Sequence, residues 1–340
     1  MSTTDEDSVG VSVAWSWQGV SANIKSRFLS AVDRLGGRRI DENGLGSERR
    51  ISAHRALTDA RVLMIEAATR AVTKDIESNP ELARRALQLF SRADRQAENI
   101  DACLDLTVED LLNRDHSWKQ TSGDPERIED HVIDRWEHYA GQATSDQLRE
   151  RWGRVLAAEI RSPGTFSLKC MRIVDEIDAE VAHLFELLCT QRVLNWVPEC
   201  NSPINHNDVD RLIEAGLLVQ TELGRTVSFS RVTSKRNLWI MGFGSFGIGV
   251  TANACFPAGN RIEKLDLGEN GLALPVHVLS EAGVALASIM PDPGTVPALR
   301  LAQAMARVSE KDAVLFYRLD GDRWIKIPLP DSIDEAPVSN

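Results

Sequence analysis

The stretch SDQLRERWGRVLAAEIRSPGTFSLKC, residues 145–170, contains the start of one helix, its end and the start of another. Ser145 is a residue type that caps helices by accepting a hydrogen bond from the first free backbone N–H groups. The Leu, Ala, Arg and Glu residues that follow are strong helix formers. Ser162-Pro163-Gly164 then stops the helix, and Ser167 caps the next one. The stretch therefore predicts helix, tight turn and helix, which is typical of an all-α domain.

Apolar residues continue at helical spacing toward the N-terminus. The pattern predicts an amphipathic helix over 13–36, a long helix over 53–77 and another over 80–112. Asn79-Pro80 separates the last two, because the residue before a proline is pushed out of the helical region. Since the connection is short, we expect these two helices to form an antiparallel hairpin.

The chain changes character after residue 195, where alternating and glycine-rich segments replace the helical pattern. We therefore expect a mainly α protein, with an N-terminal helical bundle followed by a smaller α+β C-terminal domain. The predicted segments are a tail, an amphipathic helix and a linker over 1–50, a helical domain over 51–195, an α+β domain over 200–330, and a tail over 331–340.

Composition favours an intracellular globular protein. Hydrophobic residues make up 43% and charged residues 26% of the 340 residues, which is ordinary for a chain with a real core. The five cysteines form no CxxC pair, and the acidic N-terminus has no apolar segment behind it. We therefore expect a cytoplasmic location and predict no metal site and no cofactor.

The net charge of −11 is unevenly distributed. Residues 101–200 hold 11 basic and 20 acidic side chains, whereas residues 51–100 hold 8 basic and 7 acidic ones. A surface for duplex nucleic acid needs the opposite balance, so bulk nucleic-acid binding is disfavoured. A local basic patch stays open.

Three blocks resemble a bacterial family of uncharacterised proteins, the domain of unknown function 2806 family. They are RALQLFSRADRQAENID (85–101), LRERWGRVLAAEIRSPGTFSLK (148–169), and LIEAGLL (212–218) together with LSEAGVAL (279–286). The second block is the most specific, and it departs from the family pattern at Ala158, where glycine is usual. The resemblance implies a bacterial, intracellular protein and no particular activity. A weaker similarity to helical proteins of abortive phage infection implies a setting in phage defence.

The second block also supplies a candidate functional patch, made of Trp152, Glu159, Ser167 and Lys169. Trp152 and Glu159 share a helix face, so the carboxylate would be partly desolvated and could act as a tuned acid. The alternative is structural, with Glu159 accepting hydrogen bonds from the turn at 163–167. A hydrolase or nuclease acting through Glu159 is the enzymatic alternative, but no nucleophile with a neighbouring base supports it.

Two further motifs are weak on their own. His131, Asp134 and His138 share one helix face and could approach a metal, but a solvated acidic face explains them equally well. The glycine pattern over 242–247 matches G-x-G-x-x-G, but the surrounding residues predict a buried strand pair instead of a dinucleotide-binding helix.

Two segments offer binding surfaces. Residues 205–230 predict a helix followed by a hairpin of strands 217–220 and 226–230, similar to the second half of a winged helix, with Arg225 as its nucleic-acid contact. The helix over 13–36 could instead lie on an anionic membrane. Its candidate membrane contacts are Trp15, Trp17, Lys25, Arg27 and Phe28.

With no catalytic set in any motif, the sequence favours a non-enzymatic interaction or regulatory protein, a sensor or scaffold in stress or phage defence. We expect a protein partner or self-association. A nucleic-acid-binding regulator using 205–230 and a peripheral membrane protein anchored by 13–36 stay open as alternatives.

Overall fold

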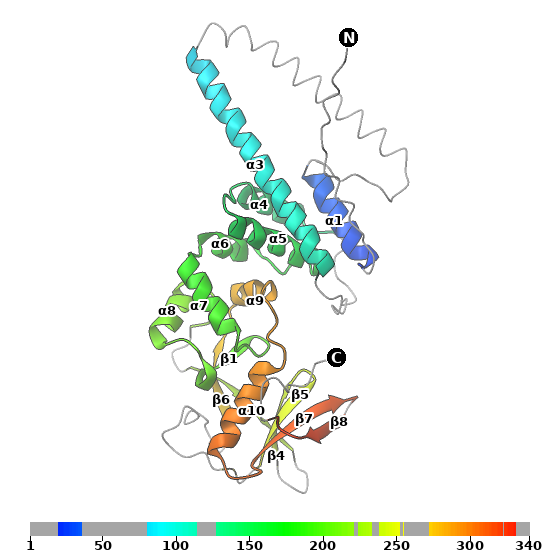
Figure 1. The fold of residues 1–340 in the computed structure, drawn as a ribbon, viewed down its shortest axis with the longest axis vertical. Helices are drawn as coiled ribbons and strands as arrows, with labels where there is room; N and C mark the ends of the chain where they lie inside the picture. The colour runs from blue at the N-terminus through cyan, green and yellow to red at the C-terminus, as the bar shows by residue number, and fades with distance from the viewer. Residues whose placement is uncertain are drawn as a thin grey trace, which may run out of the picture. The chain divides into compact units, whose positions relative to one another are not determined.

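The computed structural model describes residues 20–35, 80–113, 127–220, 224–232, 238–251, 254, 272–321 and 323–330. The chain divides into two compact units, Met1–Gly164 and Thr165–Asn340. The described residues of the first unit are helical, and those of the second combine helices with two antiparallel sheets (Figure 1). The mainly helical character is thus confirmed, whereas the bundle arrangement and the predicted domain limits stay predictions.

Four helices make up the described part of the first unit: α1 (Ala22–Arg34), α3 (Pro80–Asn113), α4 (Asp130–Ala140) and α5 (Asp146–Arg161). Ser145 caps α5 as predicted, because its Oγ accepts a hydrogen bond from the Leu148 N–H. α3 and α5 approach closely at Gly153, where an added Cβ would lie 2.8 Å from the Cβ of Leu106. The predicted helix over 53–77 lies outside the described residues.

Buried polar side chains join these helices through main-chain carbonyls. The Arg27 guanidinium on α1 donates to the carbonyl oxygens of Ile160 and Arg161, both at 3.1 Å, at the end of α5. The Trp136 indole donates to the Trp152 carbonyl at 2.8 Å. The Ile160 and Arg161 carbonyls lie in the last turn of α5, where carbonyls lack a helical N–H partner, so the Arg27 guanidinium satisfies acceptors that would otherwise be costly to bury.

The second unit begins with α6 (Leu168–Glu176) and continues into a three-stranded antiparallel sheet of order β1-β6-β2. Ser167 caps α6 as predicted, with the Cys170 N–H donating to its Oγ. The elements around this sheet are α7 (Ala179–Cys189), β1 (Trp196–Pro198), the short 3-10 helix η1 (Glu199–Asn201), α8 (His206–Glu214), β2 (Arg225–Ser228), β6 (Ala273–Val278) and α9 (Glu281–Ser288).

The predicted hairpin between 217–220 and 226–230 is wrong in its pairing. Leu218 forms a bridge with Leu279, and β2 pairs with β6 from Arg225 opposite Val276 onward. Both segments therefore lie along the same edge of β6. The alternation of side chains shows where strands run but not which strand is the partner, so a partner far along the chain leaves the same local pattern.

A second antiparallel sheet has the order β3-β4-β5-β7-β8. Its strands are β3 (Ser230–Val232), β4 (Leu238–Phe243), β5 (Phe246–Thr251), β7 (Val314–Asp320) and β8 (Arg323–Ile327), and the helix α10 (Val296–Val308) accompanies them. The strand pair predicted around the glycine pattern over 242–247 is β4 and β5, which are joined by a turn with Gly244 at φ +63°. No described helix is long and apolar enough to cross a membrane.

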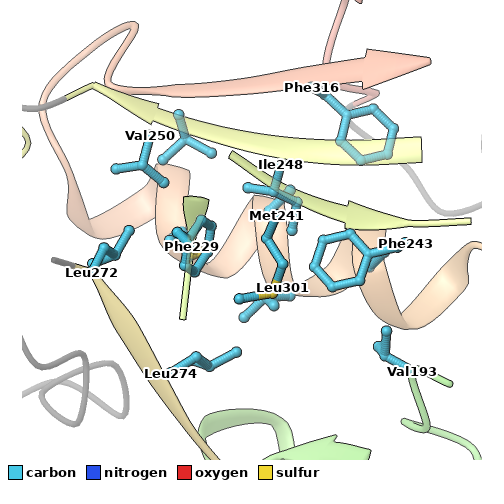
Figure 2. Packing of buried hydrophobic residues seen from close by; sticks show 14 of the residues in the cluster. Val193, Phe229, Met241, Phe243, Ile248, Val250, Leu272, Leu274, Leu301 and Phe316 are labelled. Carbon is cyan, nitrogen blue, oxygen red and sulfur yellow. The ribbon is translucent and has the colours of Figure 1, made fainter. Parts of the chain in front are cut away.

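The core of the second unit lies between the two sheets and α10 (Figure 2). Phe229 lies between β2 and β3, where the chain passes from the first sheet to the second. Its backbone N–H donates to the Leu272 carbonyl at 2.8 Å. Leu274 of β6, Ile248 of β5 and Leu301 of α10 are all buried in the same cluster. One apolar core thus holds both sheets together.

Glycines on the other face of the second sheet make room for aromatic rings. A Cβ at Gly249 would lie 2.6 Å from the Tyr317 ring, and one at Gly247 would lie 3.0 Å from the Trp324 ring. The glycines of the G-x-G-x-x-G match therefore have structural roles: they allow an aromatic ring to pack against the sheet, and they allow the tight turn of a hairpin.

Candidate interaction surface

The candidate surface belongs to the helix–sheet unit, which we define as α7, β1, α8, β2, β6 and α9. Each of its three helices begins at a side-chain cap that accepts a backbone N–H. Asp178 caps α7 at 2.7 Å, Asn205 caps α8 at 3.0 Å, and Ser280 caps α9 at 3.0 Å. These caps fix the residue at which each of the three helices begins.

The motifs LIEAGLL and LSEAGVAL, far apart in sequence, interlock in this unit. The Ser280 N–H donates to the Leu217 carbonyl at 2.9 Å, and the Ser280 hydroxyl donates to the Gly216 carbonyl at 2.5 Å. Gly216 has φ +75°, which glycine adopts without strain. A Cβ at Gly283 would lie only 2.1 Å from the Leu217 carbonyl oxygen, so α9 approaches this turn closely because residue 283 is glycine.

The outer face of α8 is acidic. Val209 and Leu212 are buried, whereas Asp210 and Glu214 are exposed to solvent. The helix has one arginine, Arg211, and its guanidinium is held by the Glu180 carboxylate of α7 at 2.9 and 3.0 Å. This hydrogen bond and charge lower the pKa of Glu180. The exposed charge of α8 is therefore negative.

Beside β1 the chain turns through a strained leucine. Val193 and Trp196 exchange two backbone hydrogen bonds at 2.8 and 3.1 Å, and Leu194 in the turn between them has φ +54°. A bulky residue in this left-handed region is disfavoured, and the turn type prefers Asn or Gly. Leu194 is nevertheless 65% exposed, so it presents an apolar side chain to solvent.

The candidate patch of the second block does not form one exposed surface. Trp152 is 1% exposed and stacks on Tyr139 at 5.0 Å between ring centroids. Glu159 is 2% exposed, and its carboxylate accepts a hydrogen bond from the Gly164 N–H at 2.6 Å, as the structural alternative proposed. Ser167 is the helix cap described above, and Lys169 is exposed.

The residues expected to meet a membrane divide into three groups. Trp15 and Trp17 lie outside the described residues. Arg27 and Phe28 are 2% and 0% exposed, because α1 turns them toward the other helices of its own unit. Lys25 is partly exposed. Membrane contact through Arg27 and Phe28 would thus require α1 to leave its site.

The remaining candidates stay on the surface. Asp134 forms hydrogen bonds at 2.9 and 3.0 Å to Arg34, and His131 lies 3.1 Å from Glu129, so these side chains pair with neighbours. Among the described residues, no group of three or more His, Cys, Asp or Glu side chains could hold a metal ion. Arg225 is exposed at the start of β2.

Sequence reasoning missed Leu194 and the acidic face of α8. A positive φ leaves no mark in the sequence when the residue is leucine. The carboxylates of α8 were visible, and their alternation with Val209 and Leu212 was the signal for an acidic outer face.

Residues 84–196 match a family described as a protein of unknown function (DUF2806). This match includes the blocks at 85–101 and 148–169, so the resemblance is confirmed over about a third of the chain. The interlocked motifs at 212–218 and 279–286 lie beyond it. No curated protein and no solved structure matches the chain.

Proposed function

We propose that the protein is a non-enzymatic interaction protein whose helix–sheet unit docks onto a protein partner. The connectivity supports a winged-helix type of module: α7, then β1, then α8, then two strands of which the last, β6, is central. In such modules the helix in the position of α8 often enters the major groove of DNA. The segment between β2 and β6 differs from a simple wing, because it carries β3, β4 and β5 of the second sheet.

The acidic outer face of α8 is the observation that carries the proposal. DNA presents a dense row of phosphates, which Asp210 and Glu214 would repel. Arg211 does not offset them, because Glu180 already holds its guanidinium. A protein partner with a basic surface is the complementary occupant.

Leu194 supports a protein partner further. The apolar core of a protein interface can bury an exposed leucine side chain, whereas a phosphate backbone offers no apolar surface to cover it. The turn holds Leu194 in a strained conformation with 65% of its surface exposed. A conformational cost at an exposed residue is typical of functional positions.

The nucleic-acid alternative through 205–230 rests on Arg225. A single exposed arginine beside an acidic helix is a weak footprint, since phosphate-binding surfaces gather several cations. We also propose a role in stress or phage defence, which the resemblance implies. This role does not depend on the contacts argued above.

The test is affinity capture from native cells with the full chain and with the charge-reversal variant Asp210→Lys/Glu214→Lys. We expect the full chain to retain a specific partner and the variant to lose it. The partner is then purified and its affinity measured at increasing salt, which should weaken binding because exposed charges are screened. The control Glu109→Lys/Glu310→Lys makes the same change of charge at exposed positions elsewhere.

Two results would overturn the proposal. One is turnover of a nucleotide or nucleic acid by the pure protein. The other is binding of duplex DNA that Arg225→Glu abolishes while Asp210→Lys/Glu214→Lys leaves partner capture unchanged.

A further inference from the structure

The two halves of α3 differ in their surroundings. From Asn99 onward the helix packs against α4 and α5, and Asn99 itself is 5% exposed, with its amide donating to the Gly141 carbonyl. The N-terminal half extends beyond these helices (Figure 1). Leu89 in this half is 69% exposed.

Arginines form a stripe along this half. Arg84, Arg92 and Arg95 are all exposed, and they share one face because successive residues are rotated by about 100°. Gln88 lies between them on the same face and is exposed as well. We call Arg84, Arg92 and Arg95 the arginine stripe. Arg85 lies at its border and pairs with Glu81 at 3.2 Å.

The members of the arginine stripe make no ion pair with any described residue, and the stripe stands out because three such arginines share one helix face. Elsewhere in the first unit, Arg34 pairs with Asp134 and Arg154 with Glu150, whereas Arg127 is a single exposed arginine without an ion pair to a described residue. A chain of net charge −11 has more carboxylates than basic side chains, so acidic partners for a surface arginine are plentiful. The three unpaired guanidiniums therefore form a local positive surface.

We propose that the arginine stripe binds the phosphate backbone of a nucleic acid without reading its sequence. The guanidinium is a planar fork that matches phosphate oxygens in pairs, and it loses water more readily than an ammonium group. Charges beyond about 8 Å are largely screened at physiological salt, so the acidic remainder of the chain does not cancel the local field.

The length of the stripe fits this ligand. Residues 84 to 95 span about 16 Å of helix, a length over which one strand of duplex DNA carries about five phosphates. A straight row of cations on a rod complements a straight row of anions. This binding is independent of the docking proposed for the helix–sheet unit.

The experiment measures fluorescence anisotropy of a labelled duplex DNA and a labelled single-stranded RNA with the full chain, from about 50 to 200 mM salt. We expect weak binding that falls with salt, with a log–log slope of about −3 for the duplex and about −2 for the single strand if three phosphates are contacted. Arg84→Gln/Arg92→Gln/Arg95→Gln should weaken binding about tenfold or more at the lowest salt and flatten the duplex slope by about 3. Glutamine keeps helix propensity, so melting should be unchanged.

The control Arg127→Gln/Arg172→Gln/Arg307→Gln removes the same charge from other exposed positions and should bind like the unmodified chain. Three results would overturn the proposal: no binding at the lowest salt, an equal loss in the control, or binding confined to vesicles containing phosphatidylserine. The first two reject the stripe as a polyanion site, and the third assigns it to a membrane.

Discussion

The two units rely to different degrees on two kinds of junction. In the first unit, long polar side chains reach across helix junctions to main-chain carbonyls, as Arg27 does at the end of α5. The second unit has the closest glycine junctions, at Gly283 against Leu217 and Gly249 against Tyr317, whereas the first has a looser one at Gly153 against Leu106. A hydrogen-bonded junction fails when a donor is lost, whereas a glycine junction fails when an atom is added.

Gly283→Ala should produce the largest effect. The added Cβ would lie 2.1 Å from the Leu217 carbonyl oxygen, which is main chain and cannot rotate away, so α9 must shift. We expect a loss of about 3 kcal/mol in the free energy of unfolding. Denaturant unfolding measures it, and hydrogen exchange should place the lost protection mainly in the second unit.

Val284→Ala is the matched control, because Val284 is 41% exposed on the same turn of α9. Its stability should change little. If Gly283→Ala is as mild as this control, the close approach of α9 is not what holds the junction.

Arg27→Met tests the first unit in the opposite direction, by removing donors while keeping length. The carbonyls of Ile160 and Arg161 lose a buried partner, and we expect a loss of about 2 kcal/mol. The exposed Asn23→Ala, on the same helix, is its control. Equal stability of the two variants would mean that apolar contacts of α1, such as Phe28, dominate its docking.

Leu194→Asn tests a position of the second unit where the backbone has a positive φ but the residue is neither glycine nor asparagine. Asparagine tolerates this conformation, so we expect a gain of about 0.5 to 1 kcal/mol. Leu194→Ala keeps the strain and should show no gain. Under the proposed function, Leu194→Asn is also more stable and yet binds its partner less tightly, a combination that a structural role would not produce.

The pair Glu180–Arg211 should give the smallest effect, since both side chains are at the surface. Arg211 lowers the pKa of Glu180 below its ordinary value of 4.5, so the pair stabilises the protein above that pH. The contribution disappears as the pH falls through the lowered pKa. Melting of Glu180→Gln against the unmodified chain should differ at pH 6 and converge at lower pH; a constant difference would contradict this account.

Local chemistry explains what the sequence could predict. Ser145 and Ser167 act within three residues, and both cap helices as predicted. The strand pair predicted around the glycine pattern over 242–247 was equally local.

What could not be predicted depends on distant partners. The choice of β6 as the partner of β2 depends on residues about fifty positions apart, and nothing near Gly283 shows that Leu217 will approach it. Partial burial of Glu159 was expected because Trp152 shares its helix face, and its hydrogen bond to the turn at 163–167 was expected as the structural alternative. The exposure of Leu89 was not, because its spacing matched that of the buried leucines of α3.

The central position of β6 has a consequence for synthesis. β1 and β2 emerge from the ribosome first, but their partner strand follows only at Ala273–Val278. Pairing of Trp196 with Val278 closes a long loop, and such non-local contacts form slowly. The second unit therefore completes its three-stranded sheet only after β6 has been synthesised, and the edges of β1 and β2 stay open to wrong pairing until then.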